Sequence, residues 1–139
     1  MTAVLDHTIV PVKDQDESVE FYTRVLGFQY DGRAGMDDRF SVIRLNDSFT
    51  LDLQRFDVIP DPGIHYAFAM ERDQFDRSFQ AIKDSGIPFG DGPRDKTNMR
   101  GPGISTGAKG ETRSGYFSDP SGHRLEIITY ACAPAASPG

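Results

Sequence analysis

The segment "YFSDPSGHRLEI", Tyr116 to Ile127, contains a strand, a tight turn and the start of a second strand. The tetrapeptide "DPSG" has the residues that β-turns prefer. In the strand after the turn, Leu125 and Ile127 share one face and Glu126 lies on the other, because neighbouring side chains in a strand point to opposite faces. This pattern predicts a sheet with one packed face and one face that carries a carboxylate.

The strand "TLDL", Thr50 to Leu53, repeats this pattern, and Asp52 corresponds there to Glu126. A strand that contains a histidine lies upstream of each carboxylate. These strands are "VLDHTIVPV", which contains His7, and "IHYAFAM", which contains His65. Both are enriched in the β-branched or aromatic residues that favour strands.

A helical pattern follows each histidine strand. The segment "DQDESVEFYTRVLG" has Asp14 or Asp16 as a potential N-cap and Gly27 as the stop signal, and "RDQFDRSFQAIKDSG" ends at Gly86. The second helix is predicted to bury one face, made by Phe75, Phe79 and Ile82. "RFSVIRL" and "SFTLDLQRF" complete a β-α-β-β order in the first half, with room for a further strand at "FQYDG".

This weak internal repeat predicts two half-modules, at about residues 4–58 and 64–130, within a single domain of residues 1–130. The glycine-rich segment 90–115 shows little periodicity and is predicted to be a mobile loop. Its excess of basic residues fits either a lid over an anionic group or a solvated loop. We expect His123 to be exposed in the turn, and residues 131–139 have a disordered composition.

Size and charge exclude several classes of protein. The chain has 139 residues, a net charge of −6 and one cysteine. An acidic protein lacks the cationic field that nucleic acid requires, and a single cysteine excludes an intrachain disulfide. The sequence has no signal peptide and no apolar run long enough to cross a bilayer, so we expect a cytoplasmic protein with no membrane partner.

The four polar strand residues suggest a metal site. If the two sheets enclose a cleft, His7, His65 and Glu126 can converge there as ligands of a divalent metal, a donor set used with iron, zinc or manganese. Asp52 is a fourth ligand, a water-positioning residue or a base. Taken singly, each histidine fits a half-buried hydrogen-bonded residue, and Glu126 fits an ion pair with Arg124 or Arg44.

The segments "LDHTIVPVKDQDESVEFYTRVLGF", "HYAFAM" and "YFSDPSGHRLEI" resemble the vicinal oxygen chelate (VOC) superfamily. This superfamily includes glyoxalase I, bleomycin and fosfomycin resistance proteins, and extradiol dioxygenases. The resemblance implies an α+β fold of paired βαβββ modules whose curved sheets surround a cleft. It also implies that His7, His65 and Glu126 bind a divalent metal ion such as Fe, Mn, Zn or Ni.

The resemblance places Tyr116, in "Y-x-x-D-P-x-G-x-x-x-E", where a tyrosine of extradiol dioxygenases binds a substrate oxygen. It implies a metal-dependent dioxygenase, lyase or isomerase that chelates neighbouring oxygens of a small, anionic or neutral substrate, with Tyr116 and Asp52 as catalytic residues. The alternative is a metal-free protein that binds a small molecule or antibiotic, as bleomycin resistance proteins do. The resemblance to this superfamily also implies a homodimer.

Overall fold

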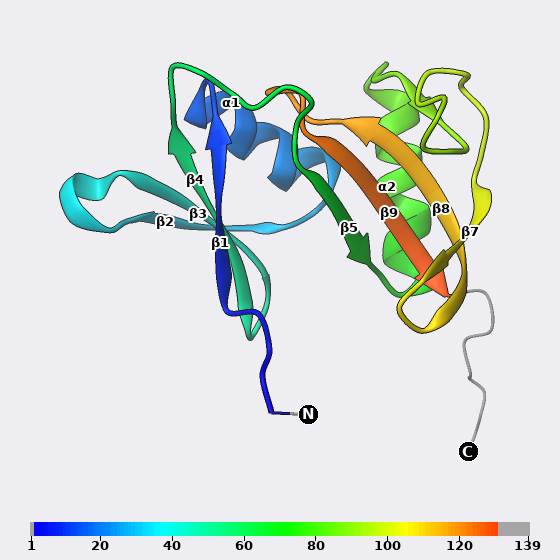
Figure 1. Ribbon diagram of the computed structural model, residues 1–139, viewed down its shortest axis with the longest axis horizontal. Coiled ribbons are helices and arrows are strands. Elements are labelled where there is room, and N and C mark those ends of the chain that lie inside the picture. The colour runs from blue at the N-terminus through cyan, green and yellow to red at the C-terminus, as the bar shows by residue number, and fades with distance from the viewer. Residues whose placement is uncertain (1, 131–139) are drawn as a thin grey trace. The chain divides into compact units, whose positions relative to one another are not determined.

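The structure, a computed structural model, describes residues 2–130, so the predicted disordered tail lies outside the described residues. Contacts divide the chain into two compact units. One contains the residues up to Gly63 together with the turn Asp119–Gly122, and the other contains Ile64–Ser118 and the strand that follows the turn. In the described part of the chain, no helix has the length and apolar character that a membrane span requires. Figure 1 shows the elements of each unit.

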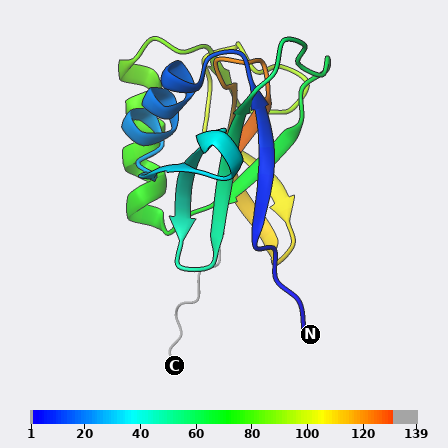
Figure 2. The same ribbon diagram turned by 90° about the vertical axis from the view of Figure 1, so that its left-hand side faces the viewer.

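The first unit has a four-stranded sheet in the order β1-β4-β3-β2. β1 pairs with β4 in parallel, and the other neighbours are antiparallel. Figure 2 shows β1 along one edge of this sheet. The further strand predicted at "FQYDG" is confirmed as β2. The elements are β1 (His7–Val12), α1 (Gln15–Glu20), the π-helical turn η1 (Phe21–Val25), β2 (Gln29–Ala34), the 3-10 turn η2 (Met36–Asp38), β3 (Phe40–Asn46) and β4 (Phe49–Arg55).

The first helix begins and ends at the residues that its sequence indicates. The Asp14 side chain accepts a hydrogen bond from the Glu17 amide at 3.0 Å, so Asp14 is the N-cap. Gly27 has a φ of 76°, a left-handed conformation that glycine adopts without a Cβ clash. Between them, Tyr22 and Leu26 are fully buried. The predicted helix is thus confirmed, although its second half is a π-helical turn.

The second unit repeats this arrangement with one added strand. Its sheet has the order β5-β9-β8-β6, in which β5 and β9 are parallel, and β7 pairs with β8 outside this path. The βαβββ order of the first unit, repeated in the second with the added strand β7, confirms the predicted α+β fold. The elements are β5 (His65–Ala69), α2 (Arg72–Asp84), β6 (Phe89–Gly90), β7 (Gly103–Gly107), β8 (Gly110–Ser118) and β9 (Arg124–Tyr130).

Helix α2 covers one face of the second sheet (Figure 1). The predicted apolar stripe of this helix is confirmed, because Phe75, Phe79 and Ile82 are all buried. Phe79 lies so close to β8 that a Cβ on Gly115 would be 2.8 Å from its ring. A glycine is therefore needed at this point of closest approach between helix and sheet. Leu125 and Ile127 of β9 are fully buried, which agrees with the predicted packed face of that strand.

The prediction of an irregular loop over residues 90–115 is wrong for its second half. Gly103–Gly107 and the first residues of β8 form a paired antiparallel hairpin. Small polar residues with little hydrophobic contrast hide the alternation of these strands from a sequence reading. Residues 91–102 are irregular but hydrogen-bonded, since Asn98 donates to Asp91 Oδ1 at 2.7 Å and the Met99 amide donates to the Phe89 carbonyl at 2.8 Å.

The turn Asp119–Gly122 makes its hydrogen bonds with the first unit. Asp119 Oδ2 accepts from the Tyr22 hydroxyl at 2.7 Å, and Ser121 Oγ accepts from the Lys13 amide at 3.0 Å. Inside the turn, Asp119 Oδ1 accepts from the Ser121 amide at 2.9 Å. Both acceptor residues are buried, so these hydrogen bonds satisfy polar atoms that water does not reach.

We predict that Tyr22→Phe lowers the free energy of unfolding by about 1–3 kcal/mol, because the buried Asp119 carboxylate loses a hydrogen-bond donor while the ring is retained. Urea denaturation measures the change as a lower midpoint with an unchanged slope. Tyr30→Phe is the control, since the Tyr30 side chain is exposed. Equal midpoints for Tyr22→Phe and wild type would contradict this account.

Candidate functional site

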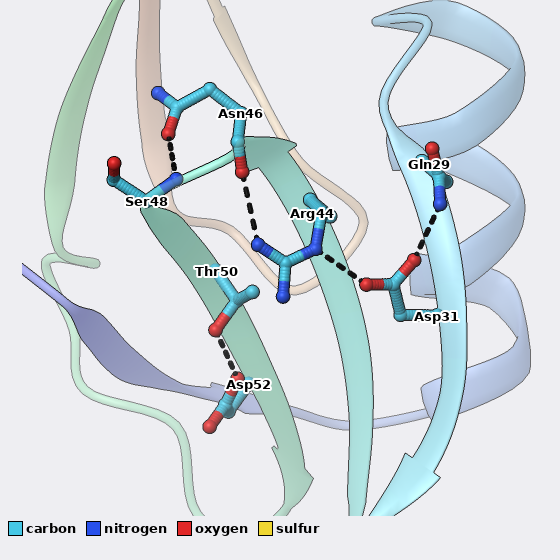
Figure 3. Close-up of polar contacts among 7 residues, drawn as sticks. All are labelled: Gln29, Asp31, Arg44, Asn46, Ser48, Thr50 and Asp52. Atoms are coloured by element: carbon cyan, nitrogen blue, oxygen red, sulfur yellow. Dashed lines mark hydrogen bonds and ion pairs between the residues drawn. The ribbon is translucent and has the colours of Figure 1, made fainter.

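The first unit brings His7 and Asp52 to the same face of its sheet. His7 is paired with Thr50 in the parallel β1–β4 ladder, and Asp52 is two residues further along β4. Because residues two apart in a strand share a face, the three side chains lie together. Thr50 Oγ1 donates to Asp52 Oδ1 at 2.9 Å, as Figure 3 shows.

His7 is held by a carboxylate that the sequence reading did not identify. Its Nδ1 atom lies 2.7 Å from Asp6 Oδ2. This hydrogen bond, together with the negative charge of Asp52, raises the pKa of the His7 imidazole. Its Nε2 atom has no hydrogen bond to the described residues, so neutral His7 can offer this nitrogen to a metal ion while Asp6 orients the ring.

The second unit brings His65 and Glu126 together. The parallel pairing of β5 with β9 places Ala67 opposite Glu126, so His65, two residues before Ala67, shares the face of the carboxylate. His65 Nε2 lies 3.3 Å from Glu126 Oε1. Glu126 is 8% exposed, whereas the His65 side chain is 43% exposed. The site therefore consists of a buried carboxylate with an accessible imidazole beside it.

Tyr116 is the direct cross-strand partner of Glu126 in the antiparallel β8–β9 ladder. Its hydroxyl donates to Ser105 Oγ at 3.1 Å. Burial raises the pKa of the Tyr116 phenol, and the nearby Glu126 carboxylate acts in the same direction, while the Ser105 hydroxyl opposes them. The phenol is thus stabilised in its protonated form next to the carboxylate.

Further hydroxyl groups continue along β8 on the face of Tyr116. Thr112 and Ser114 are fully buried, and their hydroxyl oxygens lie 2.8 Å apart. Ser105, Thr112 and Ser114 fall in the segment that the sequence reading treated as a loop, which is why it missed them. The spacing of Thr112, Ser114 and Tyr116 at every second residue was the signal that could have identified a strand with one polar face.

The predicted exposure of His123 is wrong, because this residue is fully buried. Its Nδ1 atom accepts a hydrogen bond from the Ile64 amide at 3.0 Å. The turn ends at Gly122, and the chain then enters β9, so the imidazole is enclosed as the parallel pairing with β5 begins. The Arg124 amide donates to the Ile64 carbonyl at 2.9 Å at the same point. His123 therefore has a structural role at the start of this ladder.

The sequence analysis also did not identify a second polar group on the first sheet, which consists of Arg44, Asp31 and Asn46. Arg44 Nε donates to Asp31 Oδ2 at 2.6 Å, and Arg44 Nη1 donates to the Asn46 carbonyl at 3.0 Å (Figure 3). The Arg44 guanidinium lowers the pKa of Asp31 through this hydrogen bond. Arg44 is the cross-strand partner of Thr50, so it belongs to the same polar face as His7. Within the first unit, Arg44 is therefore the ion-pair partner of Asp31.

Each unit contains one imidazole and one carboxylate of the four residues that the sequence analysis singled out. Within residues 2–130, no three His, Cys, Asp or Glu side chains gather closely enough to hold a metal ion. The chemistry of the donors nevertheless fits a divalent ion, because two imidazoles and a buried carboxylate are donors that first-row metals prefer. The ligand set of His7, His65 and Glu126, and the roles of Tyr116 and Asp52, stay predictions.

Proteins that are similar to this chain over most of its length include two transferases and one oxidase. The glutathione transferase FosA of Serratia marcescens is 28% identical over 129 residues, which cover 91% of this chain and 81% of FosA. The metallothiol transferase FosB of Lysinibacillus sphaericus is 27% identical over 128 residues, which cover 90% of this chain and 81% of FosB. Among solved structures, the oxidase ChaP-H2 is 31% identical, with a TM-score of 0.77 and coverage of 94% of this chain and 98% of ChaP-H2.

The family comparison covers almost the whole of the two units. Residues 4–127 match the family described as the Glyoxalase/Bleomycin resistance protein/Dioxygenase superfamily. This range includes both histidine strands and extends to the carboxylate strand β9. The chain therefore belongs to the Glyoxalase/Bleomycin resistance protein/Dioxygenase superfamily.

Proposed function

We propose that this protein is a divalent-metal-dependent enzyme that binds two neighbouring oxygen atoms of a small substrate. His7, His65 and Glu126 are the proposed ligands. The observation that carries the proposal is the buried Glu126 carboxylate, which lies 3.3 Å from His65 Nε2. Burial of a carboxylate is unfavourable unless positive charge or hydrogen-bond donors compensate for the lost water. A metal ion bound by Glu126 and His65 would supply that positive charge.

The surroundings of His7 support its assignment as a ligand. A metal-binding histidine commonly gives its second ring nitrogen to a carboxylate, which fixes the ring and its tautomer. Asp6 is placed to do this, with its carboxylate 2.7 Å from Nδ1. The bound ion would supply Lewis acidity at the substrate oxygens.

Tyr116 and Asp52 are the proposed catalytic residues. Tyr116 lies opposite Glu126 and has a phenol whose pKa is raised by burial, so at neutral pH it keeps its proton and can hydrogen-bond to a substrate oxygen. Asp52 shares the face of His7, and its Oδ1 atom accepts from Thr50. Because Asp52 is one methylene shorter than a glutamate, we assign it to proton transfer or water positioning rather than to metal binding.

The relatives favour an oxidative reaction. ChaP-H2 is named an oxidase and is 31% identical, whereas the two transferases are less similar. We therefore propose oxidation of a catechol-like or enediol-like compound, with transfer, lyase and isomerase chemistry as the other reactions of the superfamily. Basic side chains also support an anionic substrate. Those exposed between residues 90 and 115 are Arg94, Arg100, Lys109 and Arg113.

The first test is metal content. We predict that wild type binds about one divalent ion per chain. His7→Ala, His65→Ala and Glu126→Gln should each weaken metal binding by at least about 10- to 100-fold. Loss of a residue that only hydrogen-bonds to a metal ligand already weakens metal binding by this factor, so loss of a ligand should cost at least as much. Competition with a chelating dye measures these affinities. Glu111→Gln is the matched control, because Glu111 is an exposed glutamate of the neighbouring strand β8.

The same experiment separates the enzyme from the metal-free alternative. A wild-type protein that binds no divalent ion, yet still binds small aromatic ligands, would favour a sequestering protein. Full metal affinity in all three variants would show that the ligand assignment is wrong.

The second test concerns Tyr116. We predict that Tyr116→Phe keeps metal affinity and fold but binds nitrocatechol, a probe with neighbouring oxygens, roughly 10- to 100-fold more weakly, the effect of losing a hydrogen bond to a charged group. The visible absorbance of the probe reports binding to the metal-loaded protein. Tyr66→Phe, on the opposite face of the same sheet, should behave like wild type. Equal affinity of Tyr116→Phe and wild type would remove Tyr116 from the site.

A further inference from the structure

The hydrogen bond between Tyr116 and Ser105 connects the candidate site to the added hairpin of the second unit. Ser105 lies in β7 and is the cross-strand partner of Thr112 in β8. Tyr116 is four residues further along β8, so its side chain extends back along the strand to place its hydroxyl 3.1 Å from Ser105 Oγ. Ser105 thus touches the end of the phenol that is also close to Glu126.

The backbone on both sides of Ser105 is held by close packing. At Gly103, an added Cβ would overlap the Asp91 carbonyl. At Gly107, an added Cβ would lie 2.8 Å from the Tyr130 hydroxyl, and the same hydroxyl accepts a hydrogen bond from the Lys109 amide at 3.2 Å. Two glycines therefore let β7 approach its neighbours closely, and Ser105 between them has a fixed position.

The chemistry of the three groups gives Ser105 a specific role. The phenol has a single proton, and both Ser105 Oγ and the Glu126 carboxylate are close enough to influence it. A carboxylate can only accept a hydrogen bond, whereas a serine hydroxyl can accept and donate. Ser105 can therefore hold the phenol both when Tyr116 donates to it and when the phenol proton turns towards another acceptor.

We infer that Ser105 is a positioning residue, which orients the Tyr116 hydroxyl for hydrogen bonding to a substrate oxygen. This inference rests on the proposed function for its consequence in substrate binding, but the Ser105–Tyr116 contact exists independently of any reaction. Without the Ser105 hydroxyl, the Glu126 carboxylate and the Ser114 hydroxyl are the remaining side chains that influence the phenol. The phenol would then lose the contact at 3.1 Å that fixes its direction, and it would be a poorer donor to a bound substrate.

The test compares Ser105→Ala with Ser105→Thr, which keeps the hydroxyl group. The matched control is Thr106→Ala, because Thr106 is the next residue of β7, is exposed and points to the opposite face. NMR of protein labelled at the tyrosine Cζ carbon reports the hydrogen bonding of the Tyr116 phenol without requiring activity. Ser105→Ala should shift the Tyr116 signal, and Ser105→Thr and Thr106→Ala should leave it near the wild-type position.

Affinity for nitrocatechol supplies the functional measurement. With metal affinity unchanged, Ser105→Ala should bind the probe roughly two- to tenfold more weakly, as expected for one hydrogen bond, and Ser105→Thr should restore binding. If Ser105→Ala does not fold, Ser105→Cys replaces it, since a thiol is a weaker hydrogen-bonding group of similar size.

The outcomes separate the inference from the proposed function. A Tyr116 signal that does not move in a folded Ser105→Ala or Ser105→Cys protein overturns the inference, as does wild-type probe affinity in that protein. A shifted signal in a chain that binds neither metal nor probe supports the orientation of Tyr116 by Ser105 and rejects the proposed enzyme.

Discussion

The parallel pairing of the first and last strands of each unit is the constraint on which each imidazole–carboxylate pair depends. The β1–β4 ladder places His7 beside Thr50 and close to Asp52, and the β5–β9 ladder places His65 on the face of Glu126. Parallel strands need a long crossover connection, which here contains a helix and further strands. A shift of one residue in either ladder would turn the carboxylate towards the helix-covered face and destroy the pair.

Burial of the Glu126 carboxylate carries an energetic cost, because the charged group loses contact with water. Its neighbours in β9, Leu125 and Ile127, pack on the helix side, so Glu126 cannot leave its own face without disturbing the core. An imidazole at 3.3 Å and a phenol on the opposite strand are its polar surroundings. A buried carboxylate is most stable next to positive charge or hydrogen-bond donors, so the positions of these two polar groups bear directly on its stability.

Sequence reading succeeded where hydrophobic periodicity is strong. The Phe75–Ile82 stripe of α2 and the alternation around Glu126 have large contrasts between apolar and polar positions, and both appear in the structure as predicted. It failed at β7 and early β8, where Ser, Thr and Gly have too little contrast to show a period. It also failed at His123, because the burial of this residue follows from long-range pairing with the β5 start, which a local turn motif does not report.

The two imidazole–carboxylate pairs are related by the repeat but differ in their physical environment. The His7 side chain is 54% exposed, and its pKa is raised by Asp6 and Asp52, so His7 keeps its proton to a higher pH than an ordinary imidazole. Glu126 is enclosed and has no such access to water. Asp52 is half-buried and keeps more contact with water than Glu126. Two carboxylates in equivalent strands thus have unlike surroundings, and unlike surroundings are what separate acid and base functions at catalytic sites in general.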